Sequence, residues 1–233
     1  MEDLLRRNID WNALFKTADL TPQIQKHLGN VYTTLVATVL AAAIGSITAI
    51  VLRMGSGLLF FVGLALAISL NFIPREQVAK RIGVLLGFGF VQGLSLGPFL
   101  AQLARIDPSI ITSAFLGTVC IFGCFSAAAV FAKRRSYLYL GGFLSSALTI
   151  MFFTSLANMF FRSTFAFNAI LYLGLLVFCG FVVFDTQLVI ERAAVGNTDF
   201  VSDALGLFMD FVAIFVRLAI ILSKDNKKKN ERK

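Results

Sequence analysis

Charged residues are scarce in this chain of 233 residues. They make up only 15% of it, whereas roughly 25% is usual in a soluble domain, and 58% of the residues are hydrophobic. The mean hydropathy of +0.81 also lies far outside the range of soluble domains. This composition indicates an integral membrane protein. We expect no cleaved signal peptide, because residues 1–30 are a polar mixture with four acids and four Lys or Arg.

Histidine and cysteine, the usual ligands of transition metals, are also rare. His27 is the only histidine, so no His-rich metal site can form. Cys120, Cys124 and Cys179 lie inside apolar stretches, where cysteine usually acts as a small hydrophobic residue. The sequence has no P-loop, no G-x-S-x-G and no H-E-x-x-H motif. We therefore expect no enzyme and no bound cofactor.

Long apolar stretches are what the sequence has in abundance. A helix needs about 20 residues to cross the hydrocarbon core of a bilayer. The stretches run approximately over 31–52, 57–73, 82–104, 110–132, 137–159 and 166–190, with a seventh, more polar one at 203–222. The first six are expected to span, and the seventh either spans or dips in and returns. The fold class is an all-α polytopic membrane helix bundle.

Three parts of the chain follow from this pattern. They are a cytosolic N-terminal segment at 1–30, a single transmembrane bundle at 31–222 and a polybasic C-terminal tail at 223–233. In the third apolar stretch, Gly83 and Gly87, and then Gly89, Gly93 and Gly97, repeat the G-x-x-x-G spacing that allows helix backbones to approach closely.

Lys and Arg are concentrated in alternate connections. The N-terminal region and the loops at 74–81 and 133–136 hold three or four each, whereas the intervening loops hold only Arg53, Arg105 and Arg162. Because cytosolic loops carry the excess of positive charge, the N-terminus is expected in the cytosol. The basic tail would be cytosolic by the same rule, yet seven spans would put it on the far side. The tail is either simply solvated or in contact with anionic lipid headgroups.

Two acids lie inside the last apolar stretches. Asp185 precedes Glu191 by six residues, and Asp210 follows Ser202 by eight, so a helical hairpin with a rise of about 1.5 Å per residue brings the acids to a similar depth. Two carboxylates in a poorly solvated site cannot both ionise cheaply. We therefore expect Asp185 and Asp210 to form a pair that holds a shared proton, or a divalent cation in its place.

A second pattern surrounds this pair. Asp203, Asp210 and Arg217 are seven residues apart, close to two helical turns, so they lie on one stripe that should face the bundle interior. Arg192 follows Asp185 at the same spacing. Arg192 or Arg217 could therefore neutralise an acid. The alternative is a buried ion-pair network that only fixes the register of the helices.

The runs DPSIITSAFLGTVCIFGCFSAAAVFAKRRSYLYLGGFLSSAL, FDTQLVIERAAVGNTDF and LFMDFVAIFVRL resemble the Bax inhibitor 1 family of membrane proteins, and the likeness extends to LTPQIQKHLGNVY and GLSLGP. The resemblance implies a central last helix surrounded by six others. It also implies a pH-sensitive calcium leak in the endoplasmic reticulum membrane that lowers stored calcium and suppresses apoptosis and stress-induced cell death. The paired aspartates of the family correspond to Asp185 and Asp210. A further aspartate, common in animal members, is replaced here by Gly206.

Other functions remain open on the sequence alone. The expected partners are membrane lipids, calcium as a transported ion and protons, with no nucleic acid. A non-transporting protein that binds cell-death regulators of the Bcl-2 type or other channels is an alternative. An intramembrane aspartyl protease usually has G-x-G-D at one acid, whereas Val183 and Phe184 precede Asp185. Leak and proton-coupled exchange cannot be separated, and oligomeric state and trigger are not predicted.

Overall fold

The computed structural model describes residues 21–53, 57–132 and 137–231. Within these ranges the chain forms seven helices and no strands. The helices are α2 (Pro22–Leu52), α3 (Leu59–Ser69), α4 (Val78–Ile106), α5 (Ser109–Phe131), α6 (Leu140–Phe161), α7 (Thr164–Ala194) and α8 (Phe200–Glu231). Most of the N-terminal segment, the loop at 133–136 and the last two residues of the basic tail lie outside the described residues.

Six of the seven helices are long and apolar enough to cross a membrane: α2, α4, α5, α6, α7 and α8. The exception is α3, which has only 11 residues. The sequence prediction was therefore wrong about which stretch falls short, because 57–73 gives the short helix and 203–222 lies within a long one. α3 ends at Ser69, and it does not resume before Pro74 because the residue before a proline avoids the helical conformation.

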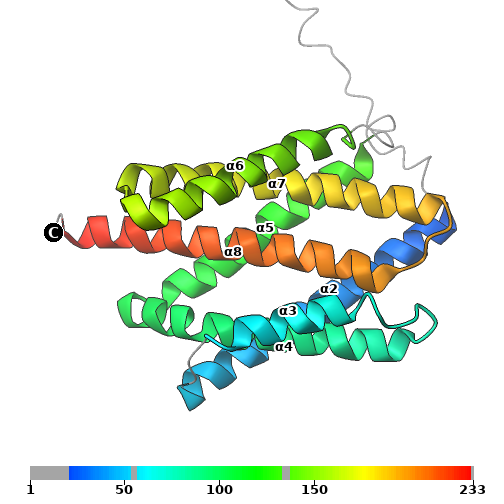
Figure 1. The fold of residues 1–233 in the computed structure, drawn as a ribbon, viewed down its shortest axis with the longest axis horizontal. Helices are drawn as coiled ribbons and strands as arrows, with labels where there is room; N and C mark the ends of the chain where they lie inside the picture. Colours follow the sequence, from blue (N-terminus) through cyan, green and yellow to red (C-terminus); the bar gives the residue numbers. More distant parts are fainter. Residues whose placement is uncertain (1–20, 54–56, 133–136, 232–233) are drawn as a thin grey trace, which may run out of the picture.

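The last helix is continuous, which favours a full span over a segment that dips in and returns. It covers 32 residues and extends into the basic tail. Its C-terminal end lies at the opposite end of the bundle from the start of α2 (Figure 1). Helix α2 begins earlier than expected. Pro22 stands in its first turn, where the N–H group that proline lacks would have no partner within the helix.

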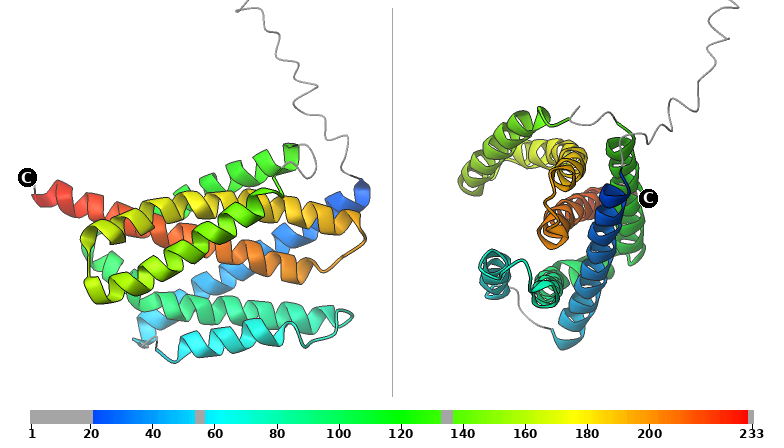
Figure 2. Two further views of the ribbon diagram at one scale, coloured as in Figure 1. Left: turned by 45° about the horizontal axis from the view of Figure 1, so that its top comes forward. Right: turned by 90° about the vertical axis from the view of Figure 1, so that its right-hand side faces the viewer.

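The last helix is also the centre of the bundle. α8 packs against α2, α4, α5 and α7, while α3 packs on α4 and α6 on α7 from outside. Figure 2 shows α8 in the middle when the bundle is viewed from one end. Phe208 and Ile214 of α8 are fully buried, and Phe208 meets Phe88 of α4 edge to face, with the ring centroids 5.8 Å apart. The resemblance predicted this central position correctly.

Three glycines of α4 let it approach α2 closely. A Cβ added to Gly93 would lie 1.9 Å from the Ala42 carbonyl oxygen, and Cβ atoms on Gly89 and Gly97 would also collide with α2. Gly83 and Gly87 have open space around the same position. The spacing therefore predicted the packing correctly for the second set of glycines and not for the first.

Candidate functional site

Asp185 of α7 and Asp210 of α8 lie side by side in the interior of the bundle. Their carboxyl groups are within hydrogen-bonding reach of each other. Asp210 is 5% exposed, and its Oδ2 atom has no hydrogen-bond partner among the described residues. Two ionised carboxylates cannot donate to each other, so a bond between them requires one shared proton. The juxtaposition expected from the helical hairpin is present.

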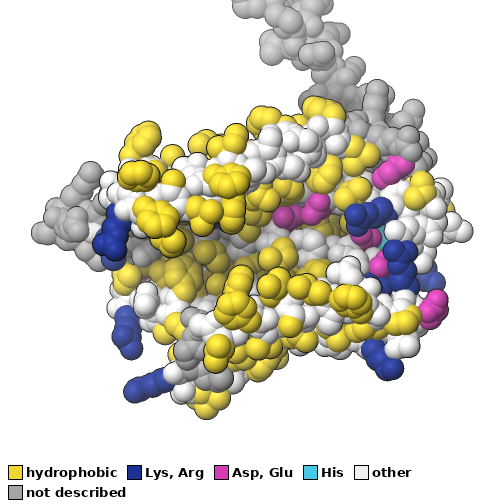
Figure 3. Space-filling model, viewed as in Figure 1, with side chains coloured by type: hydrophobic (Ala, Val, Ile, Leu, Met, Phe, Trp, Pro, Cys, Tyr) yellow, Lys and Arg dark blue, Asp and Glu magenta, His cyan; other side chains and the backbone are white. Residues whose placement is uncertain are grey.

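The surface of the bundle is hollowed between its outer helices (Figure 3). In Figure 3, acidic side chains are visible in the hollow between α6 and α7 on one side and α3 and α4 on the other. α3 and α6 do not close over α8, because they pack chiefly on α4 and α7 respectively.

Gly206 of α8 faces the pair directly. A Cβ added to Gly206 would lie 3.4 Å from Asp185 Oδ2, an ordinary van der Waals distance. A side chain at this position would therefore fit and would point at the carboxylates. Because residue 206 is a glycine, the site has two carboxylates, although an acidic side chain at this position could supply a third.

The residues that follow Asp185 anchor α7. Gln187 is 1% exposed, and its Nε2 atom donates to the Ala129 carbonyl oxygen of α5 across 2.6 Å. The Gln187 Oε1 and Thr186 Oγ1 atoms are buried without a hydrogen-bond partner among the described residues. The bond to α5 fixes the rotation of α7 and with it the direction of the Asp185 side chain.

Asp203 forms a separate ion-pair site in the first turn of α8. Arg192 Nη1 donates to Asp203 Oδ1 across 2.8 Å, and His27 Nε2 of α2 donates to Asp203 Oδ2 across 3.0 Å. Both His27 and Asp203 are 5% exposed. Arg192 thus neutralises Asp203, while it acts on Asp185 only through space. The sequence left open which acid Arg192 would join, and it missed His27.

Asp199, just before α8, holds a second arginine. Arg81 of α4 donates to both Asp199 oxygens, at 2.7 and 2.9 Å, and to the Ser202 hydroxyl at 2.8 Å. Burial raises the pKa of Asp199, but the bonds from Arg81 and Ser202 outweigh it and hold this pKa below its usual value. Sequence reasoning used Arg81 only as a loop charge. The one available signal was Asp199 three residues before Ser202, a helix-capping pattern.

These residues together tie one end of α8 to three other helices. We call them the terminal ion cluster: His27, Arg81, Arg192, Asp199 and Asp203. They surround or adjoin a polar cavity of about 310 Å³ that Arg75 also lines. Charged side chains gather at this end of the bundle in Figure 3. The cluster fixes helix register, as the alternative interpretation of the acids supposed, but it does not include the Asp185 and Asp210 pair.

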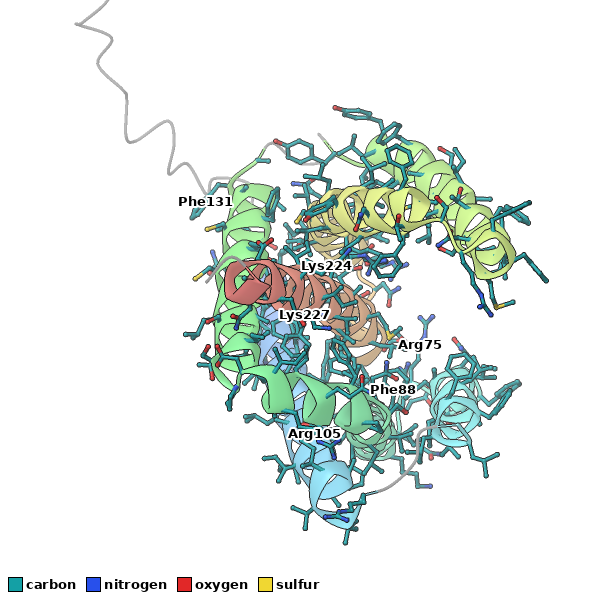
Figure 4. The ribbon with its side chains drawn as sticks, turned by 90° about the vertical axis from the view of Figure 1, so that its left-hand side faces the viewer. Arg75, Phe88, Arg105, Phe131, Lys224 and Lys227 are labelled. Carbon is teal, nitrogen blue, oxygen red and sulfur yellow. The ribbon has the colours of Figure 1, made fainter. Side chains whose placement is uncertain are left out.

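Arg217 is separate from every acid among the described residues. Its Nη1 atom donates to the Ala213 carbonyl oxygen of its own helix at 2.9 Å, and its guanidinium carbon lies 4.3 Å from the centre of the Phe178 ring of α7. At the far end of α8, Lys224 reaches between α8 and α7 (Figure 4) and donates to Asn168 Oδ1. The stripe of Asp203, Asp210 and Arg217 therefore has three different environments.

The pair offers few ligands of its own to a cation. Among the described residues, no three His, Cys, Asp or Glu side chains are grouped to hold a metal ion. Calcium prefers six to eight oxygen ligands, so the two carboxylates would need backbone carbonyls or water to complete its shell.

Comparison with known proteins places the chain in a family. The model of the family described as "Inhibitor of apoptosis-promoting Bax1" matches residues 24–227. The chain is 46% identical to Bax inhibitor 1 of Rattus norvegicus and 43% identical to that of Homo sapiens, in each case over 99% of both chains. It is 40% identical to Bax inhibitor 1 of Arabidopsis thaliana, over 96% of this chain and 91% of that one. This protein is a multi-pass membrane protein that belongs to the Bax inhibitor 1 family.

Proposed function

We propose that this protein is a pH-sensitive calcium leak channel of the endoplasmic reticulum membrane that lowers stored calcium and thereby suppresses apoptosis. The observation that carries the proposal is the Asp185 and Asp210 pair inside a membrane-spanning bundle. Ionisable residues are costly in a bilayer and usually mark ion or proton pathways. The description of the family as an inhibitor of apoptosis-promoting Bax1, together with the name Bax inhibitor 1 of its relatives, supports the link to cell death.

The pair lacks a basic partner in direct contact. Among the described residues, Arg192 is engaged by Asp203, and Arg217 donates to Ala213, so no guanidinium bonds to either carboxylate of the pair. The negative charge must then be balanced by a proton or by a mobile cation. A shared proton joins α7 to α8 through a hydrogen bond, and its loss leaves two repelling carboxylates that attract calcium.

This exchange couples pH to packing. Protonation closes the contact between α7 and α8, and deprotonation with calcium entry loosens it, which biases α8 between a sealed and a leaky arrangement. The terminal ion cluster holds the N-terminal end of α8 in place meanwhile, through His27 and Arg81. We further propose that the end of the bundle with this cluster faces the cytosol, since the Lys and Arg distribution favours it.

The test is calcium release from liposomes that contain the purified protein, across pH about 5.5 to 8. We expect a pH-dependent release that Asp185→Asn and Asp210→Asn both alter. Asp107→Asn is the matched control. It removes a carboxylate that lies between α4 and α5 and accepts hydrogen bonds from Ser109 and Asn226, outside the aspartate pair. Release that equals that of empty liposomes at every pH would contradict the proposal.

The alternative is a membrane interaction protein that does not transport ions and instead binds cell-death regulators. α6 is a candidate surface for this role, because among the described helices it packs chiefly on α7 and exposes Phe143, Phe160 and Phe161. Lipid tails cover such a surface equally well, so the paired acids favour the leak. If purified protein releases no calcium while substitutions on α6 abolish protection from cell death in cells, the alternative is correct.

A further inference from the structure

Arg217 is a cation inside the spanning part of α8 that has no acidic partner among the described residues. Within the described ranges it donates a hydrogen bond to Ala213 of its own helix, and its guanidinium lies against the face of the Phe178 ring. A charged arginine inside a membrane is costly, so such a residue usually has a function. The sequence left open whether Arg192 or Arg217 would neutralise an acid, and the structure pairs Arg192 with Asp203.

Helix α7 is shaped to receive this side chain. A Cβ added to Gly174 would lie 2.5 Å from Arg217 Nε and 2.7 Å from Met151 Cε, so the guanidinium lies directly over the glycine. The Phe178 ring, one turn further along α7, supports the guanidinium by a cation–π contact of 4.3 Å. Arg217 is therefore held at a fixed place inside the bundle and does not extend toward the membrane surface.

A cavity that is open to the surface of α6 lies against the guanidinium, since Thr149 and Ser155 in its lining are exposed. It has a volume of about 440 Å³ and is lined by Arg217, by Thr149 and Ser155 of α6, and by apolar side chains of α6 and α7. The two hydroxyls donate to carbonyl oxygens of their own helix, which leaves their lone pairs free to accept. A guanidinium has five N–H donors and Ala213 uses one. The cavity thus has enough polar groups to hold water.

The position along α8 relates Arg217 to the acid pair. Arg217 follows Asp210 by seven residues. At about 1.5 Å and about 100° per residue, this is roughly 10 Å along the helix on almost the same face. A cation that leaves the pair along this stripe toward the Lys224 end must therefore pass the guanidinium.

We propose that Arg217 is the residue that limits the rate of the leak and sets its preference between monovalent and divalent cations. This inference rests on the proposed function and deepens it. A fixed positive charge repels a divalent cation twice as strongly as a monovalent one at the same distance. The guanidinium therefore slows calcium more than potassium and keeps the rate of calcium release from the endoplasmic reticulum low.

The predicted effect has a distinct form. Because the repulsion energy doubles for a divalent ion, the factor by which calcium flux rises on neutralisation is the square of the factor for potassium. With an effective dielectric constant of about 20 and a separation of roughly 10 Å, we expect a rise of roughly 16-fold for potassium and roughly 270-fold for calcium. Chloride flux should fall or stay constant.

The experiment measures calcium, potassium and chloride release from liposomes for the wild type, Arg217→Gln and Arg217→Lys. Arg217→Lys keeps the charge and should stay within about threefold of the wild type. Arg105→Gln is the matched control, since it removes a positive charge from the exposed C-terminal end of α4, away from the cavity. Arg217→Met, unbranched and of similar reach, replaces the glutamine variant if that variant does not fold.

The outcomes separate this inference from the proposed function. A larger rise for calcium than for potassium in the neutral variants, with little change for Arg217→Lys, supports it. Calcium release by the wild type that Arg217→Gln leaves unchanged, or an equal rise for all three ions, overturns the inference and leaves the proposed function standing. No release by the wild type or any variant overturns the proposed function itself.

Discussion

Replacing Gly93 with alanine should separate α2 from α4. A Cβ at this position would lie 1.9 Å from the Ala42 carbonyl oxygen and 2.7 Å from its carbonyl carbon, whereas real Cβ atoms essentially never approach another atom within 3.0 Å. The Cβ atom would therefore be 1.1 Å closer to the oxygen than the 3.0 Å minimum allows, since 3.0 − 1.9 = 1.1. The clash is with backbone, which cannot rotate away as a side chain can.

The energetic balance of Gly93→Ala has two terms. Overpacking costs typically about 1–3 kcal/mol, and two helix backbones that meet directly place this site near the upper end. Alanine regains about 1 kcal/mol of helix propensity relative to glycine. We expect a net loss of about 2 kcal/mol in the free energy of unfolding.

Gly87→Ala provides the matched comparison in the same helix. An added Cβ there meets no atom within 4 Å, so only the propensity term remains and the variant should gain up to about 1 kcal/mol. Reversible unfolding of both variants in detergent, followed by circular dichroism, measures the two values. Equal stabilisation by the two substitutions would refute the close α2–α4 contact.

Three further predictions concern the charged sites. Asp199→Asn should cost about 2 kcal/mol at pH 7 because Arg81 loses its ionised partner. Since the pKa of Asp199 is lowered by folding, its contribution is present above the unfolded value of about 3.9 and is lost as the pH falls through the folded value. The stability difference between variant and wild type should therefore shrink in acid, and a constant difference from pH 7 to 3 would contradict this. Gly206→Asp should tighten calcium binding about tenfold in a competition assay, because a third carboxylate joins the pair; unchanged affinity would show that this face of α8 does not point at the site. Gly174→Ala should change stability by less than about 1 kcal/mol, because the clashing atoms are ends of flexible side chains, yet it should raise the calcium-to-potassium flux ratio as Arg217 is displaced; an unchanged ratio would argue against the fixed seat.

The acid pair could be predicted from the sequence because its geometry is local. Asp185 and Asp210 lie on two helices joined by a short loop, so counting residues from the loop fixes their depths to within about one turn. The same count cannot show which faces meet. Chain periodicity placed Arg217 on the stripe of Asp210 and left open whether Arg192 or Arg217 would neutralise an acid. Arg192 bonds to Asp203, whereas Arg217 lies against Phe178 and Gly174 of α7.

The terminal ion cluster could not be predicted because its contacts are long-range. His27 and Asp203 are 176 residues apart, and Arg81 and Asp199 are 118 apart. Sequence periodicity gives the face of each helix but not the neighbour that it meets. Similarly, hydropathy gives the length of an apolar stretch, and at α3 the helix ends before the apolar residues do. His27 lies in the first turns of α2, before residue 31, where the apolar stretch used to predict the helix begins.

The most direct test of the account is whether Asp185 and Asp210 act as one unit in calcium release. The pH profile should be measured in liposomes for Asp185→Asn, Asp210→Asn and the double variant beside the wild type. If the carboxylates share one proton and one cation, each single substitution flattens the profile and the double variant adds little to either. A wild-type profile in the double variant, or two independent and additive shifts, would contradict the central claim.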